Sequence, residues 1–535
     1  MGSAFKESAA TNVPEELLSA IFKNLIKRDQ ASAARVCNQW SGAALDQLWY
    51  SLDSLLPVLH LLGPTTISES KIDIPNSLED VDWGRFSLLT RRTRRLSWTA
   101  DSVFSDHLCA QLLLHQPTYH HMLPSLLEVT WEAHHDEGIE QILLVTSPSL
   151  NTLRLYLPDY SEDALRLIFR GLNIQSILLS EFSLTCNGEG EVKTEVGDFI
   201  CGQLRLRHIS LPFFFGTSKI VAALGRLKEL ESVGVTKWNL SRGDDVEWRF
   251  HPGQFPRLSK LGFATKSLME AAEIFIAHSL AQLCSVSIAT DSMRPDHPGL
   301  AVFLPALVRC CPRLSEVCLI IHHDEGNFIE EIGGEDYMEP KSFSFSDPEP
   351  PLQYTELSSL EVYHNYSIVL RKEDISRMFQ SWPCLQHLHL TADPIHDQYV
   401  TEDLIGTPLS MLATFVAHGF PNLRHLGLYF HIDCTDAFDT FALSTLPNLQ
   451  TLAVGTSQVL EGHRVATAAF LASLVEPGVL IEAGYSVHAE CNLIMYDKEA
   501  LLRPWKDVAH LMHHMHMSQK ALRYQLEVAK TKHSL

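Results

Sequence analysis

The chain has 535 residues, which is more than one compact core usually holds, so we expect several structural units. Hydrophobic residues make up 45% and charged residues 20% of the chain, a composition that excludes an intrinsically disordered protein. With 64 Asp and Glu against 42 Lys and Arg, the formal net charge is -22, and such a surface repels a phosphate backbone, so no nucleic-acid partner is expected.

Cysteine usage and the absence of long apolar runs indicate the compartment. The 11 cysteines are scattered without a Cys-x-x-Cys pair, which predicts neither a disulfide framework nor a structural zinc site. The first twelve residues lack the apolar run of a signal peptide, and no segment reaches the roughly 18 apolar residues of a membrane helix. We therefore expect an intracellular protein of the cytoplasm or nucleus, with no membrane contact and no cofactor.

Residues 10–52 are predicted to form a small three-helix module. Pro14 suits the first turn of a helix, and apolar residues then recur at helical spacing up to Leu25. Two further helical patterns follow, around Ala33 and between Trp40 and Trp49. Because domains of about forty residues rarely fold alone, part of this apolar surface is expected to face a partner or the rest of the chain.

The motifs of this module resemble an F-box. They are Val-Pro-x-Glu-Leu-Leu-x-x-Ile-Phe-x-x-Leu from Val13, Ala-Ala-Arg-Val-Cys-x-x-Trp from Ala33, and Leu48-Trp49. The chain departs from the family at Val13, where Leu is usual, and at Gln30 and Ala31, where a Leu commonly follows the Asp. The resemblance implies docking on the Skp adaptor and, through it, on a cullin. The positions expected to face the adaptor are Pro14, Leu17, Leu18, Ile21, Leu25, Val36 and Trp40, and the alternative is that they form only the module's own core.

After a linker with a helical connection at residues 53–90, residues 91–485 repeat a Pro-x-Leu-x-x-Leu-x-Leu pattern. Most units are about 24 to 32 residues apart, which is the period of leucine-rich repeats. Each unit is expected to supply one strand of a parallel sheet and a returning segment, with return helices at 163–170, 268–278 and 409–418. The clearest units lie at 123–131, 147–155, 255–263, 311–319, 382–390, 420–428 and 446–454, with a worn first unit at 94–100. The irregular spacing resembles the degenerate repeats that often accompany an F-box.

Two segments stand outside the repeat pattern. Residues 324–351 are rich in acid, and we interpret them as a solvated loop insertion rather than a docking segment for a basic partner. Residues 486–535 are predicted to cap the array, because the ends of a solenoid need covering. Their amphipathic helix places five apolar residues on one face, namely Val508, Leu511, Met515, Leu522 and Leu526.

Three clusters of polar residues resemble chemical sites, but a simpler explanation fits each of them better. His-His-Asp-Glu-Gly occurs at 134–138 and 322–326, but about seven strands at about 4.8 Å separate the copies, so they cannot form one metal site. The arginines at 91, 92, 94 and 95 favour a solvated face over a phosphate contact. Solvated helix positions also explain the tail histidines best, which are His510, His513, His514 and His516.

The sequence therefore predicts an α/β solenoid, in which a small F-box module precedes a curved leucine-rich-repeat array with a parallel sheet. No P-loop, G-x-S-x-G or H-E-x-x-H motif is present, so no catalysis is expected. The resemblance implies a substrate receptor of a cullin-based ubiquitin ligase, with an unknown target protein on the repeats. A repeat scaffold without a ligase role and a receptor with a small-molecule pocket remain alternatives. The outward strand positions expected to bind the target are Arg154, Tyr156, Glu361, Tyr363, His387, His389, His425 and Tyr429.

Overall fold

The computed structural model describes most of the chain. The described residues are 13–68, 71–99, 103–115, 121–133, 136, 138, 141–157, 161–175, 177–186, 192–236, 248, 253–277, 280–291, 297–322, 342–344, 353–364, 367–394, 406–432, 445–484 and 498–533. The chain divides into two compact units, and each unit is described by itself. The first consists of residues 1–237 with 253–257, and the second of residues 238–252 with 258–535.

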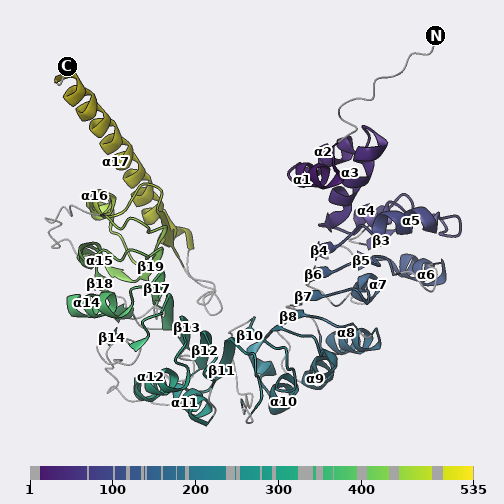
Figure 1. Cartoon of the computed structure of the whole chain (residues 1–535), viewed down its shortest axis with the longest axis horizontal. Coiled ribbons are helices and arrows are strands. Elements are labelled where there is room, and N and C mark those ends of the chain that lie inside the picture. The colour runs from purple at the N-terminus through teal and green to yellow at the C-terminus, as the bar shows by residue number, and fades with distance from the viewer. Residues whose placement is uncertain are drawn as a thin grey trace. The chain divides into compact units, whose positions relative to one another are not determined.

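The first unit begins with the predicted three-helix module. Its helices are α1 (Glu15–Lys23), α2 (Lys27–Ala33) and α3 (Asn38–Tyr50) (Figure 1). Helix α1 starts directly after Pro14, and Glu15 and Glu16 in its first turn complement the positive end of the helix dipole. Both α1 and α2 pack against α3, which is the longest of the three.

A parallel sheet follows without a gap after α3. Strand β1 pairs with β4 in parallel register, Leu52 opposite Leu96, so the array begins immediately after the helical module. Between them lie α4 (Leu56–Leu59), α5 (Trp83–Thr90) and a small separate sheet of β2, β3 and β5. The strands of that small sheet are β2 (Thr66–Ser68), β3 (Lys71–Asp73) and β5 (Val103–Phe104).

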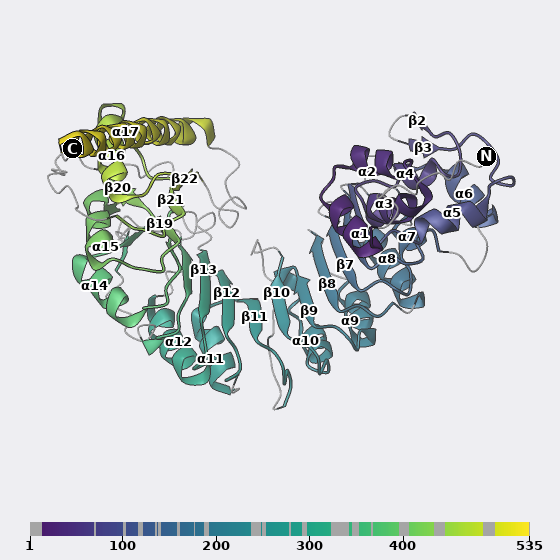
Figure 2. The same cartoon turned by 45° about the horizontal axis from the view of Figure 1, so that its top comes forward.

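In the first unit the main sheet has the order β1-β4-β6-β7-β8-β9-β10, and its neighbouring strands are parallel. Helices α7 to α9 line one side of these strands (Figure 2). The strands are β1 (Ser51–Leu52), β4 (Arg95–Thr99), β6 (Glu128–Glu132), β7 (Thr152–Leu157), β8 (Glu181–Cys186), β9 (His208–Leu211) and β10 (Ser232–Val235). The helices are α6 (Asp106–His115), α7 (Gln141–Val145), α8 (Glu162–Ile174), α9 (Lys193–Gly202), η2 (Phe213–Phe215) and α10 (Ser218–Leu224).

The second unit continues the same architecture with the order β11-β12-β13-β15-β17-β19-β21-β22, again with parallel neighbours. The strands are β11 (Lys260–Thr265), β12 (Ser285–Asp291), β13 (Glu316–His322), β15 (Ser359–His364), β17 (His387–Leu390), β19 (His425–Leu428), β21 (Thr451–Gly455) and β22 (Leu480–Ala483). The helices are α11 (Leu268–Ala277), α12 (His297–Cys310), α14 (Lys372–Ser381), η5 (Leu409–Met411), α15 (Leu412–His418), η6 (Glu461–His463), α16 (Arg464–Leu474) and α17 (Lys498–His533). Two pairs of short strands stand apart, β14 (Ser342–Ser344) with β16 (Ser367–Val369) and β18 (Thr407–Pro408) with β20 (Phe430–His431).

Alternation along the strands explains the core. On β7, Leu153, Leu155 and Leu157 are buried between half-buried or exposed residues, so one face of the sheet is apolar. Aromatic rings join that face to the return helices, for example Phe169 of α8 against Phe182 of β8 at a centroid distance of 6.1 Å. A continuous core between stacked strands and helices is the leucine-rich-repeat arrangement, so the predicted fold is confirmed.

Each quoted repeat unit contains a strand, and the three predicted return helices are present as α8, α11 and η5 with α15. Sequence reasoning missed β1, β22 and the small side sheets. These elements have two to four residues each, too few to carry a periodic signal.

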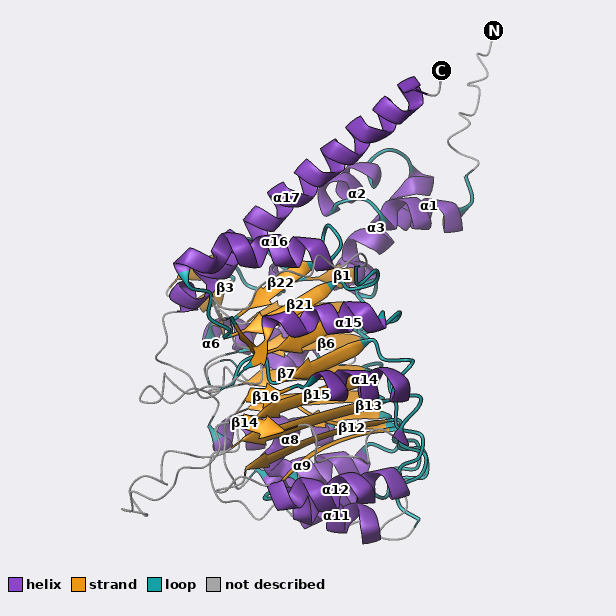
Figure 3. Ribbon diagram, turned by 90° about the vertical axis from the view of Figure 1, so that its left-hand side faces the viewer, coloured by secondary structure: helices purple, strands orange, loops and turns teal. Residues whose placement is uncertain are grey.

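Helix α17 covers the last repeats of the second unit with only its first half. Trp505, Val508 and Met512 are buried, and the Trp505 indole Nε1 donates to the Ser457 carbonyl oxygen at 2.7 Å. Leu522 and Leu526 on the second half are 59% and 60% exposed, and the helix extends beyond α16 (Figure 3). Within the described part of the chain, no helix is both long and apolar enough to span a membrane.

Candidate protein-docking surfaces

The helical module builds its core from one stripe of α1. Leu18 and Phe22, one helical turn apart, are 1% and 2% exposed and pack with Ala33, Ala43 and Ala44. Trp40 is half-buried at the edge of this core, with its ring 5.5 Å from that of Phe22 in an edge-to-face contact.

A second stripe of α1 is apolar and exposed. Leu17 and Ile21 lie one turn apart and are 56% and 53% exposed. The two ends of α2 add Ile26, at 67%, and Val36, at 61%. Four large exposed hydrophobic side chains within twenty residues are unusual for a solvated surface and typical of a surface that binds protein.

The structure thus divides the residues predicted to face an adaptor. Pro14, Leu17, Ile21 and Val36 are exposed, whereas Leu25 and Trp40 are half-buried against the module's core. Leu18 belongs to the core itself, because the stripe it shares with Phe22 faces α3. Ile26 is the exposed residue that the sequence prediction omitted, and its position between two helical patterns gave no periodic signal.

Gln30, one of the departures from the F-box pattern, has a structural role. Its side chain is buried, and Nε2 donates to the carbonyl oxygens of Phe22 at 2.8 Å and Leu25 at 3.1 Å. The Phe22 oxygen, in the last turn of α1, also accepts from the Leu25 N–H at 3.0 Å, and Leu25 lies two residues beyond the end of the helix. The polar residue therefore joins α2 to the end of α1.

On the strand face of the first unit, charges are paired. Arg154 of β7 lies between two carboxylates, with Nη1 2.5 Å from Glu128 on β6 and Nη2 2.8 Å from Glu181 on β8. These contacts raise the pKa of Arg154 against the opposing effect of its partial burial. Tyr156, two residues further along the same strand, is 42% exposed. Both predicted target-binding residues of this unit therefore lie on the same face of β7.

On the second unit, five of the predicted residues come together on three neighbouring strands. Glu361 and Tyr363 lie on β15, His387 and His389 on β17, and His425 on β19. The rings of His387 and His425 stack at 4.0 Å with an interplanar angle of 5°, and Tyr363 lies 4.6 Å from His389. We call these five residues the histidine cluster.

Hydrogen bonds connect the cluster. The Tyr363 hydroxyl donates to Glu361 at 3.1 Å, and His389 Nδ1 lies 3.4 Å from His425 Nε2. His387 Nε2 is 3.5 Å from the Glu361 carboxylate. Room for His389 depends on Gly427, because a Cβ at that position of β19 would overlap the imidazole.

Burial governs the protonation of the cluster. It lowers the pKa of His387 and lowers the pKa of His425 to about 3, where His387 and His389 oppose a further positive charge. Burial also raises the pKa of Tyr363, and the nearby Glu361 carboxylate acts in the same direction. At neutral pH the rings of His387 and His425 are therefore neutral.

Two residues predicted to bind a target at the surface are buried. His389 is 5% exposed and Tyr429 is 7% exposed. Alternation along β17 predicts an outward His389 correctly, but the segment after the strand covers it, since Thr391 turns with a φ of 46° and Asp393 lies 3.8 Å from His389 Nε2. Tyr429 follows the end of β19 and lies outside the alternating part of the strand.

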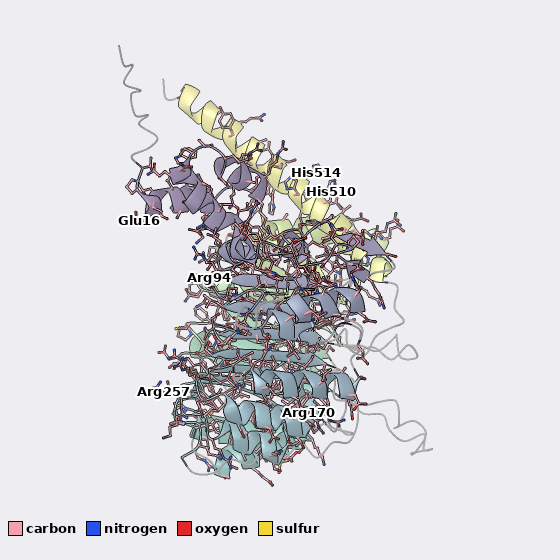
Figure 4. All side chains as sticks on the ribbon, turned by 90° about the vertical axis from the view of Figure 1, so that its right-hand side faces the viewer. Glu16, Arg94, Arg170, Arg257, His510 and His514 are labelled. Carbon is pink, nitrogen blue, oxygen red and sulfur yellow. The ribbon has the colours of Figure 1, made fainter. Side chains whose placement is uncertain are left out.

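Two members of the arginine run, Arg92 and Arg94, are half-buried and hold other parts of the first unit. Arg92 donates to Asp46 and to the Gly42 carbonyl oxygen of α3, Arg94 donates to the Ser125 carbonyl oxygen at 2.9 Å, and Arg95 lies 3.0 Å from Glu128. Figure 4 shows Arg94 in the first unit between the helical module and the strands below. The interpretation of the run as a solvated face is therefore wrong for Arg92 and Arg94, whereas the Arg95 side chain is 59% exposed, as that interpretation expects.

The tail histidines and the two His-His-Asp-Glu-Gly copies are the other clusters that the sequence analysis considered. His510 and His514 are exposed neighbours on α17, with their Nε2 atoms 3.0 Å apart (Figure 4). Most of both His-His-Asp-Glu-Gly copies, and of the acidic segment 324–351, lies outside the described residues. The part of the chain that the structure describes holds no group of three or more His, Cys, Asp or Glu arranged for a metal ion.

A three-helix module with an exposed apolar stripe, followed by a repeat array, defines a class of protein-docking adaptors. Residues 10–54 match the F-box-like family. The chain therefore carries an F-box-like domain followed by leucine-rich-type repeats, which supports a ubiquitin-ligase adaptor role in general terms.

Comparison of whole chains gives only distant similarities. No curated protein sequence matches the chain. It is similar to a chain of the TLR13–ssRNA13 complex, with 14% identity over 72% of this chain and 54% of that one, at a TM-score of 0.29. It is also similar to a chain of the Rad7 and Elc1 complex in yeast, with 12% identity over 70% of this chain and 80% of that one, at a TM-score of 0.33. The chain thus spans about half the length of the first of these proteins.

Proposed function

We propose that the chain is the substrate-recognition subunit of a cullin-based ubiquitin ligase. In this proposal residues 10–52 bind the Skp adaptor, residues 91–485 bind a target protein, and residues 486–535 cap the array. The chain itself performs no chemistry. It raises the effective concentration of the target near the ubiquitin-charged enzyme, in the cytoplasm or nucleus.

The observation that carries this proposal is the exposed stripe of Leu17 and Ile21 inside the segment that matches the F-box-like family. Its neighbours Leu18 and Phe22 already supply the module's core, so the stripe is not needed for folding. An apolar helix face of this kind fits a hydrophobic groove on a partner. The proposed contact also includes the exposed residues Pro14, Ile26 and Val36. It is adjoined by Leu25 and Trp40, which are half-buried against the module's core.

The test is a binding titration of the purified full chain with the Skp adaptor. Burying one large apolar side chain is worth about 1.5–3 kcal/mol, so Leu17→Arg should weaken binding roughly 10- to 150-fold or more. Leu167→Arg is the matched control, because Leu167 on α8 is also 51% exposed but lies outside the module. We expect it to leave adaptor binding unchanged.

Each alternative outcome has a meaning. A folded wild-type chain that does not bind the adaptor would remove the ligase role and leave a repeat scaffold for protein interactions. Equal loss in Leu17→Arg and Leu167→Arg would show that the α1 stripe is not the contact. Circular dichroism of both variants establishes that they are folded.

A further inference from the structure

The histidine cluster contains a carboxylate without a cationic partner. Glu361 accepts hydrogen bonds from the Tyr363 hydroxyl at 3.1 Å and the Ser359 hydroxyl at 3.4 Å, and both donors are neutral. None of the lysines or arginines that the structure describes forms an ion pair with it. The side chain of Glu361 is 26% exposed, so its charge is partly removed from water yet accessible to a ligand.

On the strand face of the first unit, comparable carboxylates have a cationic partner. There, Glu128 and Glu181 both contact the guanidinium of Arg154 within 2.8 Å. In the second unit the base beside Glu361 is His387, 3.5 Å away, and burial lowers the pKa of His387, so it supplies no positive charge at neutral pH. A partly buried charge without a counter-charge is unfavourable, and a cation from a ligand would relieve that cost.

Glu361 lies between the Cys318 thiol of β13 on one side and flat rings on the other. His387 and His425 stack in parallel, and the Tyr363 ring lies beside His389. Such rings offer their faces to a cation and, when neutral, their ring nitrogens as hydrogen-bond acceptors.

His389 lies behind the open part of the cluster. It is 5% exposed, and its Nε2 makes no hydrogen bond to any described residue, the Asp393 carboxylate being 3.8 Å away. Buried polar atoms in proteins nearly always have a hydrogen-bond partner. Because the segment after β17 covers this nitrogen, it is not open to a ligand, and the groups that a ligand can reach are Glu361 and the rings of His387, His425 and Tyr363.

The chemistry excludes two other ligands. An anion would meet the charge of Glu361 and neutral His387 and His425, so nothing attracts it. A metal ion requires converging ligands, and the described residues contain no such group.

We infer that the histidine cluster is a recognition site for an arginine side chain, whose guanidinium pairs with Glu361 and stacks on the rings of His387, His425 and Tyr363. Arginine fits better than lysine, because a planar guanidinium can both stack on a ring and donate two parallel hydrogen bonds to one carboxylate. The assignment of this arginine to a ligase target rests on the proposed function. The binding of arginine at the cluster is argued from the residues of the site and is independent of that function.

The test uses the folded full chain and three short fluorescent peptides of otherwise identical sequence. At the same two positions, one peptide carries arginine, one carries lysine and one carries citrulline. Citrulline keeps the shape of arginine and removes its charge. By fluorescence anisotropy at near-physiological salt, we expect the arginine peptide to bind, the lysine peptide to bind at least threefold more weakly, and the citrulline peptide not to bind. No binding of the arginine peptide, or equal binding of arginine and lysine, would overturn the inference.

Glu361→Gln should weaken arginine binding at least fivefold, and Glu361→Asp should restore part of it because the charge returns. The matched control is Glu482→Gln, which makes the same change in net charge at an exposed strand position of β22. It should change binding less than twofold. If Glu361→Gln and Glu482→Gln weaken binding of the arginine peptide equally, the peptide is attracted only by the net charge of -22, and Glu361 does not form a specific site.

Adaptor titration separates this inference from the proposed function. Glu361→Gln should bind the Skp adaptor like the wild type, which also shows that the variant is folded. If the wild type fails to bind the adaptor but discriminates among the peptides as expected, the ligase role fails and the arginine site stands. If it binds the adaptor but ignores the arginine peptide, only the arginine site fails.

Discussion

The guanidinium of Arg92 joins the F-box-like domain to the repeats of the first unit by donating to the Asp46 carboxylate and to the Gly42 carbonyl oxygen, the latter at 3.2 Å. Both acceptors lie on α3, whereas Arg92 follows α5 and precedes β4. The Arg92 side chain is only 17% exposed, so water replaces these hydrogen bonds poorly. The side chain therefore ties the last helix of the domain to the start of the strand array.

We expect Arg92→Ala to lower the free energy of unfolding by about 1–3 kcal/mol, because hydrogen bonds to charged groups are lost from a half-buried site. Urea unfolding of the full chain, monitored by circular dichroism, measures this change in the free energy of unfolding. Lys27→Ala is the control, since Lys27 and Asp53 form an ion pair with side chains 53% and 75% exposed, for which about 0–1 kcal/mol is expected. Similar losses in the two variants would argue against a structural tie at Arg92.

Replacement of Gln30 by methionine, which keeps its volume, removes the two donors to the Phe22 and Leu25 carbonyl oxygens. Gln30→Met should lower stability by about 1–3 kcal/mol, because the Leu25 oxygen loses its side-chain donor and the Phe22 oxygen keeps only the Leu25 N–H. Gln39→Met removes a single exposed hydrogen bond to the Val13 carbonyl oxygen and should have a smaller effect in the same urea experiment. A neutral Gln30→Met would mean that α1 ends equally well without the amide.

The sequence predicts the strands well because the clearest repeats combine a proline with a leucine pattern, and the spacing of the units is the period of leucine-rich repeats. It predicts the F-box-like domain as a whole but does not separate Leu17 from Leu18. Both residues fall within one broad helical face, and only packing against α3 shows that Leu18 is core and Leu17 surface.

The histidine cluster was partly predictable. Alternation places Glu361, His387 and His425 on the outward face, and the parallel register brings them together. Burial of His389 and the lack of a cation beside Glu361 depend on the turn at Thr391 and on side chains of neighbouring strands. Such relations join residues far apart in sequence, so no local pattern carries them.

The hydrogen bond from Trp505 to the Ser457 carbonyl oxygen predicts that the first half of α17 stabilises the second unit. Trp505→Phe should lower the free energy of unfolding by about 1–3 kcal/mol, because a buried carbonyl group loses its donor and a smaller ring leaves space. Leu522→Ala, at a 59% exposed position of the same helix, should change stability by about 0.5 kcal/mol or less. Equal effects in a thermal or urea unfolding experiment would contradict a capping role confined to the first half.

His425 predicts a pH dependence of stability with a definite sign. In the unfolded chain a histidine titrates near 6.5, whereas burial lowers the pKa of His425 to about 3 in the folded protein, with His387 and His389 acting in the same direction. Between these two values the unfolded chain binds a proton that the folded chain does not. The contribution is therefore complete above pH of about 6.5 and is lost progressively as the pH falls toward about 3.

Replacing His425 by glutamine removes this titration, so the loss of stability between about pH 7.5 and about pH 5 should be smaller in His425→Gln than in the wild type, by up to one proton of linkage. Urea midpoints at both pH values measure the difference. The carboxylates of Glu361 and Asp393 also face the cluster, but they are present in both proteins, so the comparison isolates His425. His513→Gln on the exposed side of α17 is the control, and it should follow the wild-type pH dependence. If His425→Gln follows the wild type as well, the pKa of His425 is not lowered in the folded protein, and the burial of its ring in the cluster is not supported.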